Sequence, residues 1–251
     1  MIKTALITGA AVRIGRAIAL DLARHGWAVA IHYNTSEDAA AKTVAEIVEA
    51  GGQAIPVQGD LADLDRLPGI VGDAIDGLGP LTLLVNNASV FEDDRIGSLT
   101  ADRWRRQMDI NLTAPCLLAQ AFAEALPDGL EGNIVNIIDQ RVWKPTPQFF
   151  SYSLSKSALW SATRTMAQAL APRIRVNAIG PGPTLANQRQ RPEDFAALVA
   201  AMPLERGASP EEVAETVRFL VGQKSVTGQM IATDGGQHLA WQTPDLAEGM
   251  E

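Results

Sequence analysis

The sequence predicts an α/β fold in which a single, doubly wound parallel sheet carries helices on both faces. Short apolar runs alternate with longer amphipathic segments along the whole chain, as in folds built from strand–helix–strand units. The apolar runs are hydrophobic without polar alternation, which is typical of strands buried on both faces of a parallel sheet. The chain has 251 residues, of which 47% are hydrophobic, and this is sufficient for one large domain over residues 1–251.

The predicted elements follow from this alternation. Strands are expected at residues 2–8, 28–33, 53–57, 81–86, 132–139, 174–179 and 229–233. Helices are expected at residues 14–25, 37–50, 63–77, 101–126, 151–171 and 210–222. Right-handed crossovers then give a doubly wound sheet, whose ligands bind beyond the carboxyl ends of the strands. Residues 183–206 interrupt the alternation with three prolines and predict a loop with a short helix, and residues 242–251 predict a polar tail.

Composition and charge argue against several classes of function. The net charge is −8 and the isoelectric point is near 5.0, which argues against nucleic acid as a partner. The N-terminus lacks a signal peptide and no apolar run is long enough to span a bilayer, so a cytoplasmic protein without membrane contact is expected. One cysteine and three scattered histidines provide no metal-ligand spacing, so no metal is expected.

The first strand runs into a glycine loop, "TGAAVRIGRAIA" at residues 8–19. Gly9 permits a tight turn, and Gly15 lets the following helix pack close to the strand, so that the helix N-terminus faces a pyrophosphate. Arg13 and Ile14 lie between these glycines and belong to the same predicted dinucleotide site.

The second strand ends without the acid that an NAD-specific site usually presents to the adenosine ribose. It provides Tyr33, Asn34, Thr35 and Ser36. Arg13 together with Thr35 and Ser36 can hold a 2′-phosphate, which favours NADPH over NADH. The alternative is that Ser36 only caps the next helix and Glu37 binds the ribose.

The third and fourth strands end in further candidate cofactor contacts. Asp60, followed by Leu61, is placed to accept a hydrogen bond from adenine. The segment "NNASVF" at residues 86–91 follows the fourth strand, and its Asn87, Ala88 and Ser89 leave room for a flat cofactor ring. Phe91 can supply a stacking face beyond that ring.

Three further side chains have the chemistry of a catalytic site. Asp139 ends the apolar run "NIVNIID", where an acid either begins a turn or faces a ligand. Tyr152 and Lys156 are four residues apart and share one helix face. An ammonium group near a phenol favours phenolate and lowers the pKa of the phenol, which would make Tyr152 a proton donor at neutral pH.

Asn111 precedes Pro115 by four residues within a predicted helix. Proline has no N–H, so the backbone carbonyl of Asn111 loses its helical partner and must bind water or a side chain. A water held there beside Lys156 can resupply protons. The alternative is a simple proline kink.

These motifs, taken in order, resemble the short-chain dehydrogenase/reductases over essentially the whole chain. The shared segments are the TGxxxxxG loop, "NNAS", Asn111, YxxxK, "GPGPT" at 180–184 and "VTGQMIATDGG". The resemblance implies a Rossmann-like fold, Tyr152 as proton donor, Lys156 on the nicotinamide ribose and Asn111 fixing the relay water. It also implies cofactor contacts from Pro181, Gly182 and Thr184, a substrate loop at residues 183–206, and a homo-oligomer, commonly a tetramer. Trp104 and Trp160 are either interface or core residues.

Two departures from that family point to a narrower branch. Asp139 replaces the usual serine, and Arg13 replaces a glycine. Both changes, with "NNASVF", are similar to the pteridine reductases, including the bacterial dihydromonapterin reductases. That resemblance implies that Asp139 assists protonation of a ring nitrogen, that Arg13 contacts cofactor phosphate and pterin, and that Phe91 sandwiches the pterin. A carboxyl group suits such a substrate because it accepts from N–H groups and donates to a ring nitrogen.

The sequence therefore predicts an NADPH-dependent reductase that transfers hydride to a C=N bond of a dihydropteridine. The expected substrate contacts are Arg13, Ser89, Phe91, Asp139 and Tyr152. One alternative is a carbonyl reductase of the same fold, for instance acting on a 3-oxoacyl thioester, and another is a non-catalytic dinucleotide sensor. NADH stays possible because the second strand ends without a basic residue.

Overall fold

The computed structural model describes residues 3–186 and 191–241. Seven parallel strands form one sheet in the order β3-β2-β1-β4-β5-β6-β7, which confirms the predicted fold class. The strands are β1 (Thr4–Ile7), β2 (Ala28–Tyr33), β3 (Gln53–Gln58), β4 (Leu83–Asn86), β5 (Gly132–Ile137), β6 (Ile174–Pro181) and β7 (Met230–Thr233). Because all pairs are parallel, the carboxyl ends of the strands meet at one edge of the sheet.

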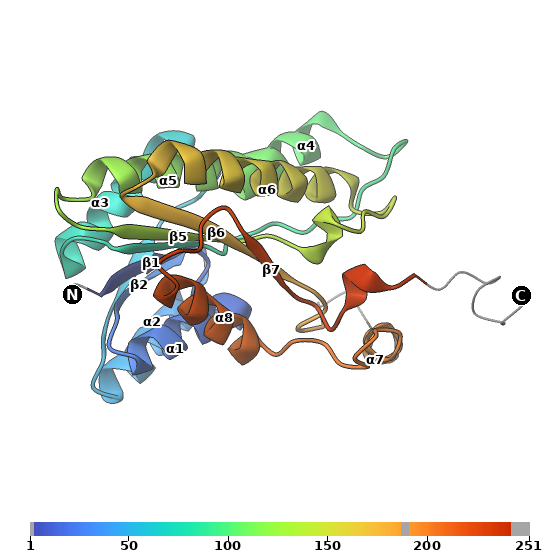
Figure 1. Cartoon of the computed structure of the whole chain (residues 1–251), viewed down its shortest axis with the longest axis horizontal. Helices are drawn as coiled ribbons and strands as arrows, with labels where there is room; N and C mark the ends of the chain where they lie inside the picture. The colour runs from blue at the N-terminus through green and yellow to red at the C-terminus, as the bar shows by residue number, and fades with distance from the viewer. Residues whose placement is uncertain (1–2, 187–190, 242–251) are drawn as a thin grey trace, which may run out of the picture.

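Helices cover both faces of the sheet (Figure 1). One face carries α1 (Arg13–Arg24), α2 (Glu37–Glu49) and α8 (Pro210–Gly222). The other face carries α3 (Leu67–Leu78), α4 (Ala101–Met108), α5 (Ala114–Ala125) and α6 (Phe150–Leu170). Two large clusters of buried apolar side chains, one on each face, fill the space between the helices and the sheet. Burial on both faces explains why the inner strands read as continuous apolar runs, whereas the edge strand β3 is partly exposed.

Two predicted boundaries differ from the structure at places that matter for the site. β5 ends at Ile137, two residues before the predicted end, because the chain leaves the sheet and Asp139 caps a short 3₁₀ turn, Gln140–Val142. The predicted helix at 101–126 is α4 and α5 joined by one π-helical turn, Asp109–Thr113, in which the Ala114 N–H donates to the Asp109 carbonyl. Pro115 is the second residue of α5 and comes directly after the π turn.

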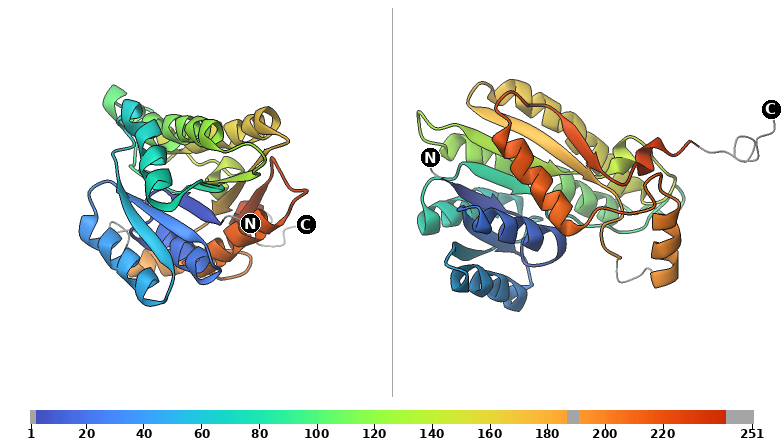
Figure 2. Two further views of the ribbon diagram at one scale, coloured as in Figure 1. Left: turned by 90° about the vertical axis from the view of Figure 1, so that its left-hand side faces the viewer. Right: turned by 60° about the horizontal axis from the view of Figure 1, so that its bottom comes forward.

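The segment after β6 contains the short helix that the sequence predicts. This helix, α7 (Pro192–Ala200), lies apart from the layers of helices against the sheet (Figure 2). Residues 187–190 of the predicted substrate loop and the predicted tail at 242–251 lie outside the described residues. Within the described ranges, no helix combines the length and the apolar character needed to cross a membrane.

Candidate active site

The predicted cofactor residues follow the carboxyl ends of neighbouring strands. Gly9 and Gly15 lie in the loop after β1 and at the start of α1, and the next strands end in residues 33–36, 60–61 and 87–89. The order reverses between β1 and β4, which are neighbours in the sheet but far apart in sequence. Such a switch point opens a crevice for a ligand. The fold thus brings these segments to one edge.

The glycine loop after β1 is packed too closely for larger residues. Gly9 has a φ of +62°, and a Cβ on Gly15 would lie 2.3 Å from the Gly9 carbonyl oxygen. The Asn87 side chain donates to the carbonyls of Thr8 and Gly9, which joins this loop to the one after β4. α1 begins without a side-chain cap and without an acid in its first turn. Its N-terminal N–H groups therefore suit an anionic group such as a pyrophosphate.

His32 holds the same loop from β2, a role that the sequence did not indicate. Its Nδ1 accepts from the Gly9 N–H at 3.2 Å, so the Nε2–H donates to the Gly59 carbonyl at 3.1 Å. The side chain is 2% exposed, and burial lowers the pKa of His32 from 6.5 to about 4. The neutral imidazole therefore ties the loops after β1 and β3 together.

This depressed pKa predicts a loss of stability in acid. Between pH 6.5 and about 4 the unfolded His32 binds a proton that the folded one does not. The free energy of unfolding is therefore fully retained above pH 6.5 and falls, by about 3 kcal/mol from this group, as the pH drops to the folded pKa. Urea unfolding across this range should show a weaker pH dependence in His32→Gln than in the wild type. The exposed His25→Gln is the matched control, and equal slopes in all three proteins would contradict the assignment.

The end of β2 leaves the predicted 2′-phosphate contacts accessible. Asn34, Thr35 and Ser36 are exposed, and Ser36 occupies the N-cap position of α2 without a side-chain capping bond. The alternative in which Ser36 only caps the helix is therefore not supported by the geometry. Glu37 is the first residue of α2, as expected.

The three predicted catalytic side chains meet beyond β5. The Tyr152 hydroxyl donates to Oδ2 of Asp139 at 2.9 Å, while Oδ1 of Asp139 accepts from the Arg141 N–H at 2.8 Å. Lys156 is buried on the same face of α6, and its Nζ donates to the Ile137 carbonyl at 2.9 Å. The turn after β5 and the first two turns of α6 thus place a carboxyl, a phenol and an amine together.

The electrostatics of this group differ from the expectation for Tyr152. Burial and the adjacent Asp139 carboxylate raise the pKa of Tyr152 well above its ordinary value, so the predicted lowering by Lys156 is wrong for this arrangement. Burial also raises the pKa of Asp139, and it lowers the pKa of Lys156 to about 8. The carboxylate disfavours a second negative charge on the phenol. Tyr152 therefore stays protonated, and its hydroxyl donates a hydrogen bond to the Asp139 carboxyl.

A cavity of about 590 Å³ opens beside these groups. Eleven predicted site residues line it: Arg13, Ile14, Asn87, Ser89, Phe91, Asp139, Tyr152, Lys156, Pro181, Gly182 and Thr184. A second hollow of about 670 Å³ between α8 and β7 contains none of the predicted catalytic or cofactor residues. The first cavity is therefore the candidate active site, with room for a flat ring beside the acid–base groups.

Aromatic rings form one wall of the active-site cavity. The ring of Phe91 stacks on that of Phe149 with centroids 4.1 Å apart, and it meets the ring of Tyr152 edge to face with centroids 4.7 Å apart. The Arg141 guanidinium covers the Phe149 ring at 5.2 Å. Phe149 has a φ of +55°, a left-handed conformation that a bulky residue rarely adopts.

Arg13 lies at the rim of the cavity. Its guanidinium donates to the backbone carbonyls of Leu185 at 3.0 Å and Ala186 at 3.1 Å, across from the glycine loop. Reaching a 2′-phosphate beside Thr35 and Ser36 would require it to give up these bonds. The geometry favours the substrate-side role of Arg13 over the 2′-phosphate role.

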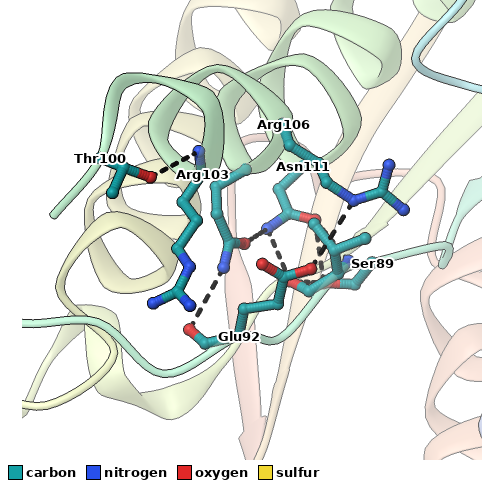
Figure 3. Close-up of polar contacts among 8 residues, drawn as sticks. Ser89, Glu92, Thr100, Arg103, Arg106 and Asn111 are labelled. Atoms are coloured by element: carbon teal, nitrogen blue, oxygen red, sulfur yellow. Dashed lines mark hydrogen bonds and ion pairs between the residues drawn. The ribbon is translucent and has the colours of Figure 1, made fainter.

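Asn111 is buried behind the cavity rather than in its lining. Its side chain binds the segment that carries Phe91: Oδ1 accepts from the Val90 N–H and the Ser89 hydroxyl, and Nδ2 donates to the Val90 carbonyl (Figure 3). Nδ2 also contacts Ser155 Oγ at 3.2 Å on α6. The relay water at its backbone carbonyl stays a prediction.

Comparison with known proteins places this site in a family. The family model described as enoyl-(acyl carrier protein) reductase matches residues 9–238. The chain belongs to the short-chain dehydrogenase/reductase family. A 3-oxoacyl-[acyl-carrier-protein] reductase of Synechocystis sp. is 34% identical over 238 residues, which cover 93% of this chain and 96% of the relative.

Two solved structures are similar over nearly the full length. The crystal structure of FolM alternative dihydrofolate reductase 1 from Brucella canis, complexed with NADP, has 55% identity, a TM-score of 0.95 and 97% coverage of both chains. A blue fluorescent protein from a metagenomic library, in complex with NADPH, has 35% identity and a TM-score of 0.86 and covers 93% of this chain and 97% of its own. The predicted family is therefore confirmed.

Several residues of this short-chain dehydrogenase/reductase site were not predicted from the sequence. Those that line the cavity include Asp93, Gln140, Arg141, Phe149, Phe195 and Gln237. Asp94 is a further one, because its carboxylate accepts from the Ser151 N–H and the Ser151 hydroxyl and so caps the helix that carries Tyr152 and Lys156. Phe149 could have been suspected from its position three residues before Tyr152. Nothing in the sequence linked Asp94 to that helix.

Proposed function

We propose that this protein is an NADP-dependent short-chain reductase that reduces a C=N bond of a dihydropteridine. The observation that carries the proposal is the buried Asp139 carboxyl, which is hydrogen-bonded to Tyr152 where the family usually has a serine. The flat ring of Phe91 in the same cavity supports a planar substrate. The Brucella FolM structures, 55% identical and complexed with NADP, support both the cofactor and the substrate class.

Each side chain has a defined task in this reaction. The cofactor bound along the strand ends would supply hydride to the ring carbon. One proton accompanies the hydride: Asp139, which also accepts hydrogen bonds from substrate N–H groups, passes it to the ring nitrogen, and the Tyr152 hydroxyl that is hydrogen-bonded to Asp139 replaces it there. Lys156 binds the nicotinamide ribose and, with water at the Asn111 carbonyl, restores the proton. Phe91 stacks on the pterin, and Arg13 contacts its edge.

The cofactor would follow the edge of the sheet from β3 to β6. The glycine loop and the start of α1 suit the pyrophosphate, residues 33–36 suit the 2′-phosphate, and Asp60 with Leu61 suits adenine. The nicotinamide end would rest on residues 87–89, Tyr152, Lys156, Pro181, Gly182 and Thr184, most of which line the cavity. NADH is the less favoured cofactor because no acid ends β2.

The test is NADPH oxidation with purified protein, offered a 7,8-dihydropterin and, in a separate assay, an acetoacetyl thioester. Turnover of the pterin with no turnover of the thioester is the expected result. Turnover of the thioester alone would replace the proposal with carbonyl reduction. Binding of NADPH without turnover of either compound would support the non-catalytic sensor, which the intact group of Tyr152, Lys156 and Asn111 argues against.

Carbonyl reduction is the second candidate because the curated relatives include 3-oxoacyl-[acyl-carrier-protein] reductases at 31–34% identity. Tyr152 and Lys156 serve a carbonyl substrate as well as an imine. An ionised Asp139 would repel the alkoxide that forms from a ketone, and this disfavours the second candidate.

Arg13→Ala is expected to raise the KM for the dihydropterin about tenfold, because one hydrogen bond to a charged group is lost. The preference for NADPH over NADH should change little, since the guanidinium binds the carbonyls of Leu185 and Ala186 rather than the end of β2. Steady-state kinetics with both cofactors measures this. A loss of affinity for NADPH without a loss for NADH would instead show that Arg13 binds the 2′-phosphate of the cofactor.

We also propose that the protein acts in the cytoplasm as a homo-oligomer, most simply a tetramer. Light scattering coupled to size exclusion measures the oligomeric state. Trp104 on α4 and Trp160 on α6 are partly buried in the single chain. These helices pack on each other on one face of the sheet, so both side chains can contribute to an interface. A monomer at micromolar concentration would contradict this proposal.

A further inference from the structure

Gln107 is a fully buried amide on α4 with both ends of its side chain bonded. Its Nε2 donates to the backbone carbonyl of Glu92 at 3.3 Å, and its Oε1 accepts from Nδ2 of Asn111 at 2.8 Å. A backbone carbonyl can only accept, so the Glu92 contact fixes which end of the Gln107 amide faces Asn111. Buried amides are costly unless satisfied, and this one is satisfied by two specific partners.

Gln107 in turn sets the orientation of the Asn111 amide. Because Oε1 of Gln107 needs a donor, Nδ2 of Asn111 must face it, and Oδ1 must then face the Val90 N–H at 2.9 Å and the Ser89 hydroxyl at 3.1 Å. The two side chains, here called the amide clamp, are joined by the bond from Asn111 Nδ2 to Gln107 Oε1, and both bind the segment after β4. An inverted Asn111 amide would place two acceptors opposite each other.

The amide clamp holds the backbone on both sides of Phe91. It binds the N–H and the carbonyl of Val90 on one side and the carbonyl of Glu92 on the other. The ion pair between Arg106 and Glu92, at 3.6 Å, joins half-exposed side chains and contributes little by comparison. The buried clamp therefore holds the backbone of the two residues that flank Phe91.

We propose that Gln107 is a positioning residue that sets the ring of Phe91 for stacking on the substrate. This inference rests on the proposed function, in which Phe91 stacks on a pterin. Phe91 is 4.7 Å from Tyr152, so a shift of its backbone changes the distance between the stacked substrate and the proton donor. Gln107 acts through Phe91 and touches neither substrate nor cofactor.

The test is a double-mutant cycle with Gln107→Met and Phe91→Ala. Gln107→Met keeps the length of the side chain and removes both hydrogen bonds. It is expected to raise the KM for the dihydropterin about tenfold and to leave the KM for NADPH within about twofold. In the Phe91→Ala background the same change should have no further effect on the pterin KM, because the ring that it positions is gone. Gln120→Met, on the exposed side of α5, is the matched control.

The outcomes separate this inference from the proposed function. An unchanged pterin KM in Phe91→Ala would refute the stacking role of Phe91. A strong effect of Phe91→Ala combined with no effect of Gln107→Met would refute the positioning role alone. Equal effects of Gln107→Met in both backgrounds would show a general structural role and also refute the inference.

Gln107→Glu provides a second variant if Gln107→Met does not fold. The carboxyl group has the shape of the amide and donates to the Glu92 carbonyl only when protonated. Relative to the wild type at each pH, its pterin KM should approach the normal value in acid and rise as the pH increases. A ratio that does not change with pH would overturn the assignment of the Glu92 contact.

Discussion

Tyr152→Phe is expected to reduce turnover of the dihydropterin about a thousandfold or more, because it removes the hydroxyl that donates the proton. The substitution deletes one oxygen from a buried site and leaves the ring in contact with Phe91. Asp139 loses its bond from Tyr152 but keeps its bond from the Arg141 N–H. The loss should therefore be confined to catalysis rather than to folding.

The measurement for Tyr152→Phe combines steady-state kinetics with NADPH titration. The Kd for NADPH should stay within about threefold of the wild type, because Lys156 and the strand-end loops are unchanged. Thermal unfolding of the variant in the presence of NADPH is the control for an intact cofactor site. Activity close to that of the wild type would remove Tyr152 from the catalytic assignment.

Asp139→Ser is expected to reduce dihydropterin turnover about a hundredfold while permitting reduction of an acetoacetyl thioester. Serine supplies a neutral hydroxyl that suits a ketone oxygen, whereas it offers neither a carboxylate for substrate N–H groups nor an acid for a ring nitrogen. Both substrates are assayed by NADPH oxidation at the same enzyme concentration. Unchanged pterin turnover would mean that the carboxylate only caps the turn at Gln140–Val142.

Asp139 also predicts the pH dependence of the wild-type enzyme. Burial raises the pKa of Asp139, and the protonated form is the one that donates. Pterin turnover should therefore be high below this pKa and decline as the pH rises through it. Asp139→Asn keeps the size of the side chain and cannot titrate, so its weaker activity should lack this decline. The same decline in Asp139→Asn would assign it to another group.

The fold was predictable because burial on both faces of a parallel sheet leaves a direct trace in the sequence. All seven strands lie where continuous apolar runs predicted them. The ends of the strands were less predictable because apolar residues can continue past the last residue of a strand. Ile138 is buried and its N–H still bonds the Ile179 carbonyl, although β5 has ended at Ile137.

The parts of the site that lie in short sequence motifs, such as the glycine loop and the Tyr152–Lys156 pair, were predictable. Eleven predicted residues line one cavity, and the family is confirmed, while their individual roles stay predictions. The predicted direction of the Tyr152 pKa shift was wrong. The spacing along α6 shows that Lys156 is near Tyr152, but it does not show that Asp139, which follows β5, is also in contact with it. Phe149 was missed because its ring partner Phe91 is distant in sequence, and Gln107 was missed because its contact with the Glu92 carbonyl comes from a separate loop.

The π turn at Asp109–Thr113 makes the orientation of α4 relative to α5 depend on the number of residues between them. A π turn contains one residue more than the α-helical turn it replaces, and one residue corresponds to a rotation of about 100° around a helix axis. α5 is anchored in the core by Leu118 and Phe122, so deleting a residue here would swing α4 and carry Gln107 away from Glu92. The proposed positioning of Phe91 therefore depends on the number of residues between α4 and α5 as well as on the side chains of Gln107 and Asn111.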